Sequence, residues 1–578
     1  MMAAMLSPAP APTLRRWHRG LLATLAGIAL FAGGCAELPA QVERPASKAW
    51  AAPESTSLGS LTQGLRQNAG SGNASGFLLL SGPQDAYAAR LALIASAQKT
   101  LDLQYYAIHA DASAGKLLRA IRAAAGRGVR VRILLDDFHS TGRNAVVMRL
   151  AFEPNIEMRM FNPLAGSRAS FLGRMVNALD DAKTLQQRMH NKLFIADNAM
   201  GVTGGRNLGD AYFGAASDGN FVDLDVLAVG PIVKDLSRSF DDYWNNERAY
   251  PVQSLVTREE LDKIREQARN AKAQEEEAVK AKPQPPDDVP MDLRKAHFTW
   301  APAVVLVDKP GKIPLNTDGK RASNAAPAQP GLEVRGGNPA VRQSTAAVAT
   351  GDDNVVDGLL SLLERARTEV NIVSPYFVPG TDMKQALATA TARGVKVRVL
   401  TNSLSSNDAV AAHAGYARHR EELLGMGVEL YEMRSDSAMA GTGPDGTGVL
   451  GSSGGRSGGG SATGSSAGAS KAMLHSKLLT IDGRLVVIGS MNLDLRSQLQ
   501  NTEIALLIRS EELSRIANQR ISEGLRTGAW RVERADGHLI WRAPEGSGLS
   551  DTTTEPQTTF GQRLMIRVIG PLAPDRLL

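Results

Sequence analysis

Two short histidine–lysine patterns lie far apart in this chain and share the same spacing. The first contains His190 and Lys192, and the second contains His475 and Lys477. Two imidazoles and two ammonium groups suit displacement at a phosphodiester. One histidine attacks phosphorus, the other passes a proton to and from the leaving oxygen, and the lysines stabilise the anionic oxygens. Because these cations belong to the protein, the chemistry predicts no metal and no cofactor.

The match between the two patterns continues beyond the lysines. Asp197 and Asp482 follow at the same spacing, and a Gly-x-x-Asn sequence ends at Asn207 in the first copy and at Asn492 in the second. A lone histidine is more often a packed or surface residue than a catalytic one. Duplication with matched spacing favours a functional role instead, and it predicts that both copies take part in the chemistry.

The elements that position these residues are predicted to be strands. His190 and Lys192 are two residues apart, so on a strand both side chains face one way and Asn191 faces the other. Apolar residues follow each pair, at 193–195 and 478–481, and fit a buried strand. Strand-like and helix-like segments alternate in both halves of the chain, which predicts an α/β repeat.

Together with several longer segments, the two patterns resemble sequences of the phospholipase D superfamily and, within it, the C-type subgroup of bacterial cardiolipin synthases. The two patterns have the form of that superfamily's histidine–lysine–aspartate (HKD) motif. The resemblance covers most of the chain from about residue 76 to about residue 542. Outside the motifs it is carried by residues 102–106, 127–137, 223–226, 373–380, 400–404 and 413–416.

The resemblance implies an α/β fold of two phospholipase D-like sandwich repeats, related by a pseudo-two-fold axis, with the active site between them. It implies a membrane phosphatidyltransferase that makes cardiolipin through a phosphohistidine intermediate. The acceptor would be phosphatidylglycerol, and the donor phosphatidylglycerol or phosphatidylethanolamine. The alternatives are hydrolysis of phospholipid to phosphatidic acid, cleavage of nucleic acid, and a non-catalytic lipid-binding lipoprotein.

The resemblance also assigns roles within the motifs. His190 is expected to be the nucleophile and His475 the general acid and base, with Lys192 and Lys477 beside them. Asp197 and Asp482 complete the catalytic set of the motif, although in the family this position supports the fold near the motif. The residues expected to bind phosphate are Asn207, Asn492 and Ser490.

Two further acids are expected to orient the histidines by accepting a ring proton. Alignment of residues 222–226 with 502–506 selects Asp223 and Glu503, and rejects Asp225. Each acid is expected to serve the histidine of its own half, so that Glu503 pairs with His475. Tyrosines at strand ends, and two residues of the family-like segment 413–416, are further candidates for substrate contact: Tyr105, Tyr106, Tyr376, His413 and Tyr416.

The chain is predicted to divide into two repeats with flanking segments. Residues 258–282 read as an exposed polar helix, 309–353 as mostly loop, and the Gly/Ser-rich stretch 441–470 as a flexible insert. The predicted parts are a lipoprotein-type signal peptide (1–34), an N-terminal tether (35–75), repeat 1 (76–257), a connector (258–353) and repeat 2 (354–578).

The N-terminus has the features of an export signal. Arginines precede a short apolar run that ends in Ala32-Gly33-Gly34-Cys35, and Cys35 is the only cysteine. This arrangement resembles a lipobox, so Cys35 is the expected lipidation site. The expected location is the bacterial cell envelope, lipid-anchored and facing the periplasm. Ala36 and Glu37 follow the cysteine, and the absence of Asp there favours the outer over the inner membrane.

The overall charge narrows the choice of partner. Sixty-five Lys and Arg against 59 Asp and Glu give a net charge of +6, without the concentrated basic face of a nucleic-acid binder. The expected partners are therefore phospholipid substrates and a membrane surface, with no nucleic acid, and the sequence identifies no accessory protein.

Overall fold

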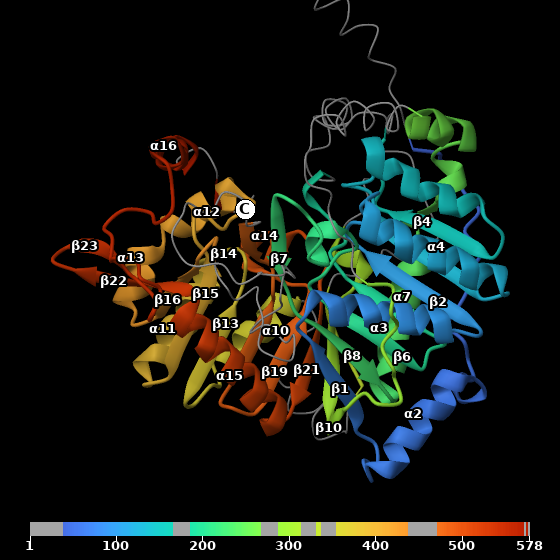
Figure 1. Ribbon diagram of the computed structural model, residues 1–578, viewed down its shortest axis with the longest axis horizontal. Coiled ribbons are helices and arrows are strands. Elements are labelled where there is room, and N and C mark those ends of the chain that lie inside the picture. Colours follow the sequence, from blue (N-terminus) through green and yellow to red (C-terminus); the bar gives the residue numbers. More distant parts are fainter. Residues whose placement is uncertain are drawn as a thin grey trace, which may run out of the picture.

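The computed structural model describes residues 38–165, 185–266, 287–313, 331–336, 354–436, 471–570 and 574–575. The predicted signal peptide, Cys35 and the insert 441–470 lie outside these residues. Two large mixed sheets lie side by side, one built by each half of the chain (Figure 1). This arrangement confirms the predicted α/β class with two repeats.

The first sheet has nine strands among the described residues, in the order β10-β1-β8-β6-β5-β2-β3-β4-β9. Its parallel strands β2, β3 and β4 are joined by crossovers, and its remaining pairings are antiparallel. The strands are β1 (Ser75–Leu80), β2 (Thr100–Tyr105), β3 (Arg130–Asp136), β4 (Ile156–Phe161), β5 (Leu193–Ala196), β6 (Met200–Gly204), β8 (Asp225–Val229), β9 (Ala249–Pro251) and β10 (Thr299–Ala301).

The second sheet repeats this order with one strand more, as β12-β11-β21-β19-β18-β13-β15-β16-β22-β23. Position by position, β18 and β19 take the places of β5 and β6, which follow the first motif. The strands are β11 (Ala303–Asp308), β12 (Leu332–Arg335), β13 (Glu369–Val373), β15 (Lys396–Asn402), β16 (Glu429–Met433), β18 (Leu478–Ile481), β19 (Leu485–Gly489), β21 (Ile504–Arg509), β22 (Ala529–Ala535) and β23 (His538–Arg542).

Helices cover both faces of each sheet. The outer faces carry α3 (Pro83–Ser96) and α4 (Ala112–Gly126) in the first repeat, and α10 (Val355–Leu363) and α11 (Thr381–Ala392) in the second. Gly128 and Gly394 follow α4 and α11 with φ of 92° and 83°, a conformation that favours glycine, so both crossovers turn in the same way.

The inner layer joins the repeats. Helices α7 (Pro231–Trp244) and α15 (Glu511–Thr527) lie there, and their apolar faces share one core with residues of both sheets. Strand β19 contacts β6 and β8 across this core. The repeats therefore pack through a common apolar layer, and separating them would expose this layer to water.

The connector is the part of the predicted organisation that is wrong. Strand β10 belongs to the first sheet, and β11 and β12 belong to the second, although all three fall within residues 258–353. Residues 303–307 are a continuous apolar run, which is the pattern of a strand buried on both faces. Repeat 2 therefore begins at β11. Residues 258–266 are helical as expected, and the rest of the predicted polar helix lies outside the described residues.

No described helix is long and apolar enough to cross a membrane. The shorter elements lie around the edges and between the repeats. These elements are α2 (Ser57–Asn68), β7 (Gly219–Val222), β14 (Phe377–Val378), α12 (Val410–Ala417), α13 (Arg420–Gly425), β17 (Lys471–Leu474), β20 (Leu493–Asp494), α14 (Leu495–Leu499) and α16 (Phe560–Ile569), with 3-10 turns at Pro53–Ser55, Gly142–Phe152, Asp210–Tyr212, Val252–Ser254 and Pro310–Lys312.

Candidate active site

Each motif histidine directly follows a backbone pairing between the two repeats. Strand β17 of the second repeat pairs in parallel with β7 of the first, in a register that places Leu474 opposite Val222. A single parallel bridge between Met189 and Thr502 forms the equivalent contact. The next residues along the chain are the two histidines and two acids. Parallel register therefore sets His475 opposite Asp223, and His190 opposite Glu503.

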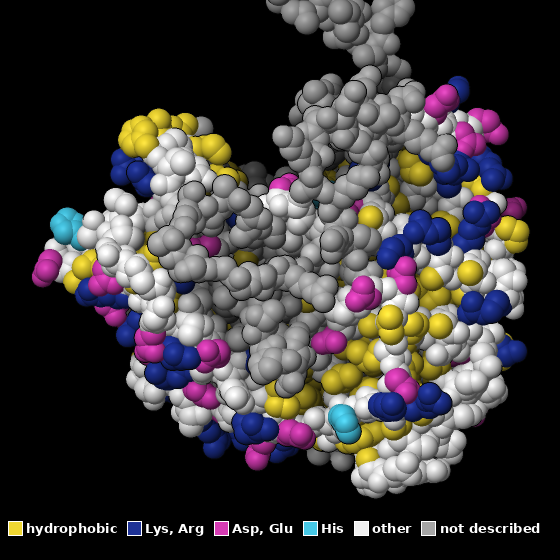
Figure 2. Space-filling view, in the orientation of Figure 1, with side chains coloured by type: hydrophobic (Ala, Val, Ile, Leu, Met, Phe, Trp, Pro, Cys, Tyr) yellow, Lys and Arg dark blue, Asp and Glu magenta, His cyan; other side chains and the backbone are white. Residues whose placement is uncertain are grey.

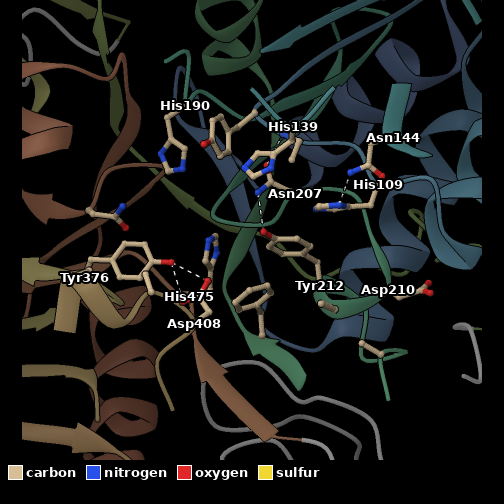
Figure 3. Close-up of a pocket in the computed structure, with 18 of the residues that line it drawn as sticks. His109, His139, Asn144, His190, Asn207, Asp210, Tyr212, Tyr376, Asp408 and His475 are labelled. Atoms are coloured by element: carbon tan, nitrogen blue, oxygen red, sulfur yellow. Dashed lines mark hydrogen bonds between the residues drawn. The ribbon is translucent and has the colours of Figure 1, made fainter. Parts of the chain in front are cut away.

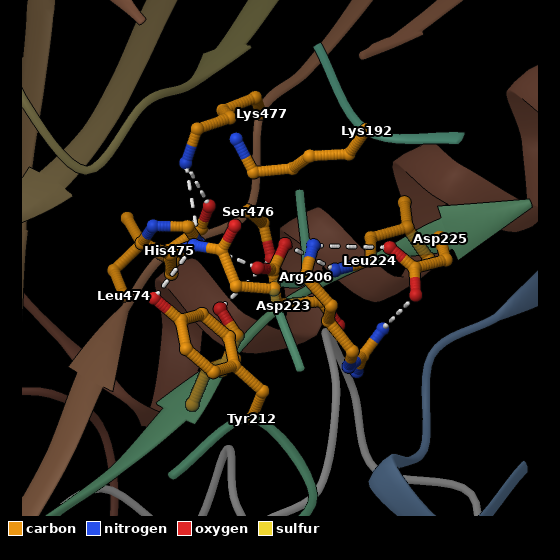
Figure 4. A network of polar contacts seen from close by, with 12 residues as sticks. Lys192, Arg206, Tyr212, Asp223, Leu224, Asp225, Leu474, His475, Ser476 and Lys477 are labelled. Atoms are coloured by element: carbon orange, nitrogen blue, oxygen red, sulfur yellow. Dashed lines mark hydrogen bonds and ion pairs between the residues drawn. The ribbon is translucent and has the colours of Figure 1, made fainter. Parts of the chain in front are cut away.

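The first of these pairs joins His475 to Asp223. Nδ1 of His475 lies 2.6 Å from Oδ2 of Asp223 (Figure 4), and the other carboxylate oxygen accepts the backbone N–H of Leu224. A Cβ on Gly205 would lie 2.2 Å from Oδ1 of Asp223. Glycine at this position therefore makes room for the carboxylate.

The second pair joins His190 to Glu503. Nδ1 of His190 lies 3.1 and 3.0 Å from the two carboxylate oxygens of Glu503. The hydroxyl of Ser490 donates to Oε2 of Glu503 at 2.5 Å and accepts the backbone N–H of Ile504. In this structure the hydroxyl of Ser490, which is expected to bind phosphate, is engaged in positioning the acid.

The two pairs cross between the repeats, which corrects the expected pairing within each half. Asp223 and Glu503 were identified correctly as partners of the histidines, and Asp225 instead binds Arg90. However, Glu503 serves His190 and not His475.

The middle residues of the motifs hold the interface between the repeats. The hydroxyl of Thr502 donates to Oδ1 of Asn191 at 2.8 Å, and the hydroxyl of Ser476 donates to the carbonyl of Val222 at 3.0 Å. These side chains point away from the histidines, as the alternation of the strand requires. The three-residue motif thus uses one face for chemistry and the other to bind the partner repeat.

The two lysines are buried beside the histidines. Nζ of Lys192 donates to the carbonyl of His190 at 2.7 Å, and Nζ of Lys477 donates to the carbonyl of His475 at 2.6 Å. Burial lowers the pKa of Lys192 to about 7, and the charge of Lys477 adds to this effect. Burial also lowers the pKa of Lys477, and the charges of both lysines lower the pKa of His190. An anion bound at this site would relieve this repulsion.

Both histidines are neutral at pH 7. Burial lowers the pKa of His190 to about 3, and it lowers the pKa of His475 as well, more strongly than the acidic partners raise these values. Burial raises the pKa of Glu503, but the hydrogen bond from His190 and the charge of Lys192 outweigh it, so this acid stays ionised. A neutral imidazole that donates Nδ1–H to a carboxylate leaves the lone pair of Nε2 free to attack.

The histidines open into one cavity of about 740 Å³ between the repeats (Figure 3). Asn207 and Asn492, two of the residues expected to bind phosphate, line it. Asn207 accepts from the backbone of Ala107 and donates to the hydroxyl of Tyr212, whereas Oδ1 of Asn492 has no hydrogen-bond partner among the described residues. Of these two asparagines, Asn492 is thus the one with spare capacity for a ligand.

The aspartates of the motif lie away from this cavity. Asp197 accepts the backbone N–H groups of residues 98–100, and Asp482 accepts those of residues 367–369. Both have positive φ, of 53° and 52°, at the turns after β5 and β18. Their inclusion in the catalytic set is therefore wrong. They fix each motif strand to the start of its neighbour, in line with the supporting role noted for this position.

Of the other tyrosine and histidine candidates, two line the cavity and three do not. Tyr106 and Tyr376 line the cavity, and the ring of Tyr106 lies 5.1 Å from that of His190. Three candidates are used elsewhere: Tyr105 accepts from Arg90, His413 contacts Arg420, and Tyr416 donates to Glu432.

The cavity is also lined by residues that the sequence patterns did not identify. His109, His139 and Tyr212 lie on the wall formed by the first repeat, and Asp408 lies on the wall formed by the second (Figure 3). Arg496 lines the cavity too, and in the described part of the chain its guanidinium forms no ion pair. None of these residues stands in a duplicated pattern, so spacing gave no signal for them.

Arg206 supports the acid of the first repeat from behind. It is buried and donates to the carbonyls of Leu80, Ser81 and Asp223. Its backbone N–H binds Asp225. Arg206 therefore fixes the backbone that carries Asp223, while the carboxylate itself is bound by the backbone N–H of Leu224 and by His475.

Comparison with known proteins gives a consistent result. The chain matches the family model described as "Cardiolipin synthase, PLD-like domain" over residues 91–244 and 359–524. It is 35% identical over 500 residues to cardiolipin synthase C of Escherichia coli (strain K12), covering 86% of this chain and 94% of that protein. It is 30% identical over 558 residues to an uncharacterised protein of Helicobacter pylori, covering 95% and 98%.

A solved structure shares the fold. The crystal structure of phosphatidylserine synthase from Haemophilus influenzae Rd KW20 aligns with a TM-score of 0.51 at 13% sequence identity, covering 89% of this chain and 100% of that one. At this identity the likeness concerns the arrangement of the two repeats, and it agrees with the sheets described above.

The crosswise pairing and the protonation states can be tested together by ¹⁵N NMR of histidine. We expect His190 and His475 to be neutral Nδ1–H tautomers at pH 7, and His190 to remain neutral at pH 5, because its pKa of about 3 lies below the ordinary value. Glu503→Gln should shift the signals of His190 alone, and Asp223→Asn those of His475 alone. The reverse pattern would restore pairing within each half.

Proposed function

Because the chain belongs to the cardiolipin synthase family with PLD-like domains, we propose that it is a phosphatidyltransferase that joins two phospholipids into cardiolipin. The observation that carries this proposal is the presence of two carboxylate-bound histidines at one cavity. Two such histidines allow transfer in two displacements, with a covalent intermediate between them.

In the first displacement one histidine is the nucleophile. Its Nε2 attacks the phosphorus of the donor lipid, a P–N bond forms, and the bond from phosphorus to the headgroup oxygen breaks. The other histidine, once protonated, gives its proton to that oxygen as the headgroup leaves. The negative charge of the donor favours this protonation, because a bound anion raises the pKa of a nearby imidazole.

The second displacement reverses the proton transfer. The acid–base histidine, now neutral, takes the proton of an acceptor hydroxyl, and the hydroxyl oxygen attacks phosphorus while the P–N bond breaks. The first histidine is restored, and the phosphatidyl group is joined to the acceptor. Lys192 and Lys477 stabilise the charge on the non-bridging oxygens in both steps, in a buried site where such charges interact strongly.

We propose phosphatidylglycerol as the acceptor, and phosphatidylglycerol or phosphatidylethanolamine as the donor. A phosphatidylglycerol acceptor presents hydroxyl groups and a second phosphate that does not react. Oδ1 of Asn492 and Oδ1 of Asn501 are buried without a hydrogen-bond partner, and Nε of Arg496 is a buried donor without one. The asparagines suit the glycerol hydroxyls, and Arg496 suits the second phosphate.

We also propose that the protein works at the bacterial cell envelope, anchored through Cys35 and facing the periplasm, with the outer membrane favoured. The lipobox-like sequence and the lipid substrates support this proposal. Cells grown with labelled palmitate should incorporate label into the protein, and Cys35→Ser should abolish it. Equal labelling of the two proteins would contradict a lipid anchor at Cys35.

The reaction itself can be tested with purified protein in mixed micelles of headgroup-labelled lipids. Cardiolipin and free headgroup should form together, and His190→Ala and His475→Ala should each lower turnover by about 10³-fold or more. Mixing the two variants should not restore activity, because each cavity takes both histidines from one chain. Phosphatidic acid as the main product would mean hydrolysis instead of transfer.

The role of Arg496 has a separate signature. Arg496→Gln should raise the KM for the acceptor by about 10- to 100-fold, the range of a lost charge-assisted hydrogen bond, while hydrolysis of the donor by water continues at the original rate. Arg238→Gln, which removes an exposed arginine remote from the cavity, is the control. Equal losses in both reactions would place Arg496 on the reacting phosphate.

A further inference from the structure

Helix α16 (Phe560–Ile569) is unusual in exposing apolar side chains. Phe560 is 72% exposed, Leu564 50%, Met565 43% and Val568 58%. At about 100° per residue these four lie within an arc of about 140° on one face of the helix. The helix is well defined, because Thr559 and Gln562 form a capping box at its start. The exposed apolar face therefore belongs to a formed helix.

This concentration does not occur elsewhere on the described surface. Among the described residues the remaining large apolar side chains with comparable exposure are scattered: Leu499 ends α14, and Val289 and Leu549 lie in separate loops. Figure 2 shows the apolar patch over α16, with basic side chains beside it. A contiguous apolar face rimmed by polar groups marks an interaction site.

The position of α16 connects it to the active site. It packs against α12 (Val410–Ala417), and Arg418, just after α12, donates to the carbonyl of Gly570. Farther along the chain, Asp575 binds His419 at 2.9 Å. At its other end α12 contributes Ala411 and Ala412 to the wall of the catalytic cavity. The exposed helix is therefore fixed to one wall of the cavity.

The charges on α16 identify the kind of surface that would cover it. Arg563 and Arg567 are the charged residues of the helix, and the segment Phe560–Ile569 contains no acid. On a helical wheel Arg567 lies about 20° from Phe560, at the edge of the apolar face. An apolar face with arginines at its edge is the pattern of a helix that lies in the interface of an anionic membrane.

We propose that α16 docks on an anionic phospholipid bilayer, with its apolar face in the boundary between headgroups and acyl chains. The inference deepens the proposed function, because it specifies how the cavity meets its lipid substrates. Docking through α16 sets α12 and the adjoining wall of the cavity close to the bilayer surface. A substrate lipid then reaches the histidines without its acyl chains crossing the whole surface of the protein.

Contact with lipid can be measured directly. Phe560→Trp in the full chain, mixed with vesicles of phosphatidylglycerol and brominated phosphatidylcholine, should show fluorescence quenching beyond that of the unsubstituted protein. Val289→Trp, a site of similar exposure remote from α16, should show none. Equal quenching at the two positions, or none at position 560, would overturn the proposal.

Turnover separates docking from catalysis. The variant Phe560→Ser, Leu564→Ser, Met565→Ser, Val568→Ser should lose at least tenfold in rate on phosphatidylglycerol vesicles. It should keep its rate on short-chain phosphatidylglycerol below the micellar concentration, which also shows that it folds. Val289→Ser with Leu549→Ser is the matched control and should retain both rates.

The remaining outcomes are distinct. If the unsubstituted protein were inactive on both substrates, the proposed function would be wrong. The quenching experiment would still test whether α16 docks on the bilayer. An unchanged rate of the fourfold variant on vesicles would overturn membrane docking. If that variant also lost self-association in light scattering, the apolar face would be an interface between copies of this chain.

Discussion

The register of two short parallel pairings between the repeats is the constraint on which the active site depends. Val222 opposite Leu474, and Thr502 opposite Met189, leave the next residues of each strand in contact: an acid from one repeat and a histidine from the other. A shift of one residue would turn each histidine to the opposite face. Neither repeat contains a complete catalytic pair, so the packing of the repeats and the assembly of the site are one event.

Burial then sets the chemistry of the assembled groups. The pKa values of both histidines and both lysines are lowered by one main cause, burial away from water, and the charges of nearby lysines lower those of Lys192 and both histidines further. A phosphodiester monoanion supplies the missing negative charge. A bound monoanion raises the pKa of a nearby imidazole, toward the protonated state that the leaving group requires.

The sequence was sufficient to predict the site residues that stand in a local or duplicated pattern. Matched spacing identified the histidines and lysines, strand alternation oriented them, and alignment chose Asp223 over Asp225. The sequence was not sufficient to predict contacts between residues that lie far apart along the chain. Spacing along the chain cannot show that Glu503 crosses to His190, nor that the hydroxyl of Ser490 donates to the carboxylate of Glu503. The strand β11 was missed because the polar segments around it dominated the interpretation of the connector.

The pseudo-symmetry of the catalytic groups implies that discrimination between substrates lies in the walls of the cavity. The two histidines have equivalent partners and equivalent lysines, yet the cavity is lined by His109 and His139 on the first repeat and by Asp408 and the alanines of α12 on the second. A transferase must bind its donor and acceptor in succession around one phosphorus atom. Because the centre is nearly symmetric, the order and orientation of the two lipids must come from these unlike walls, and the wall that carries α12 is also the one to which the exposed helix α16 is attached.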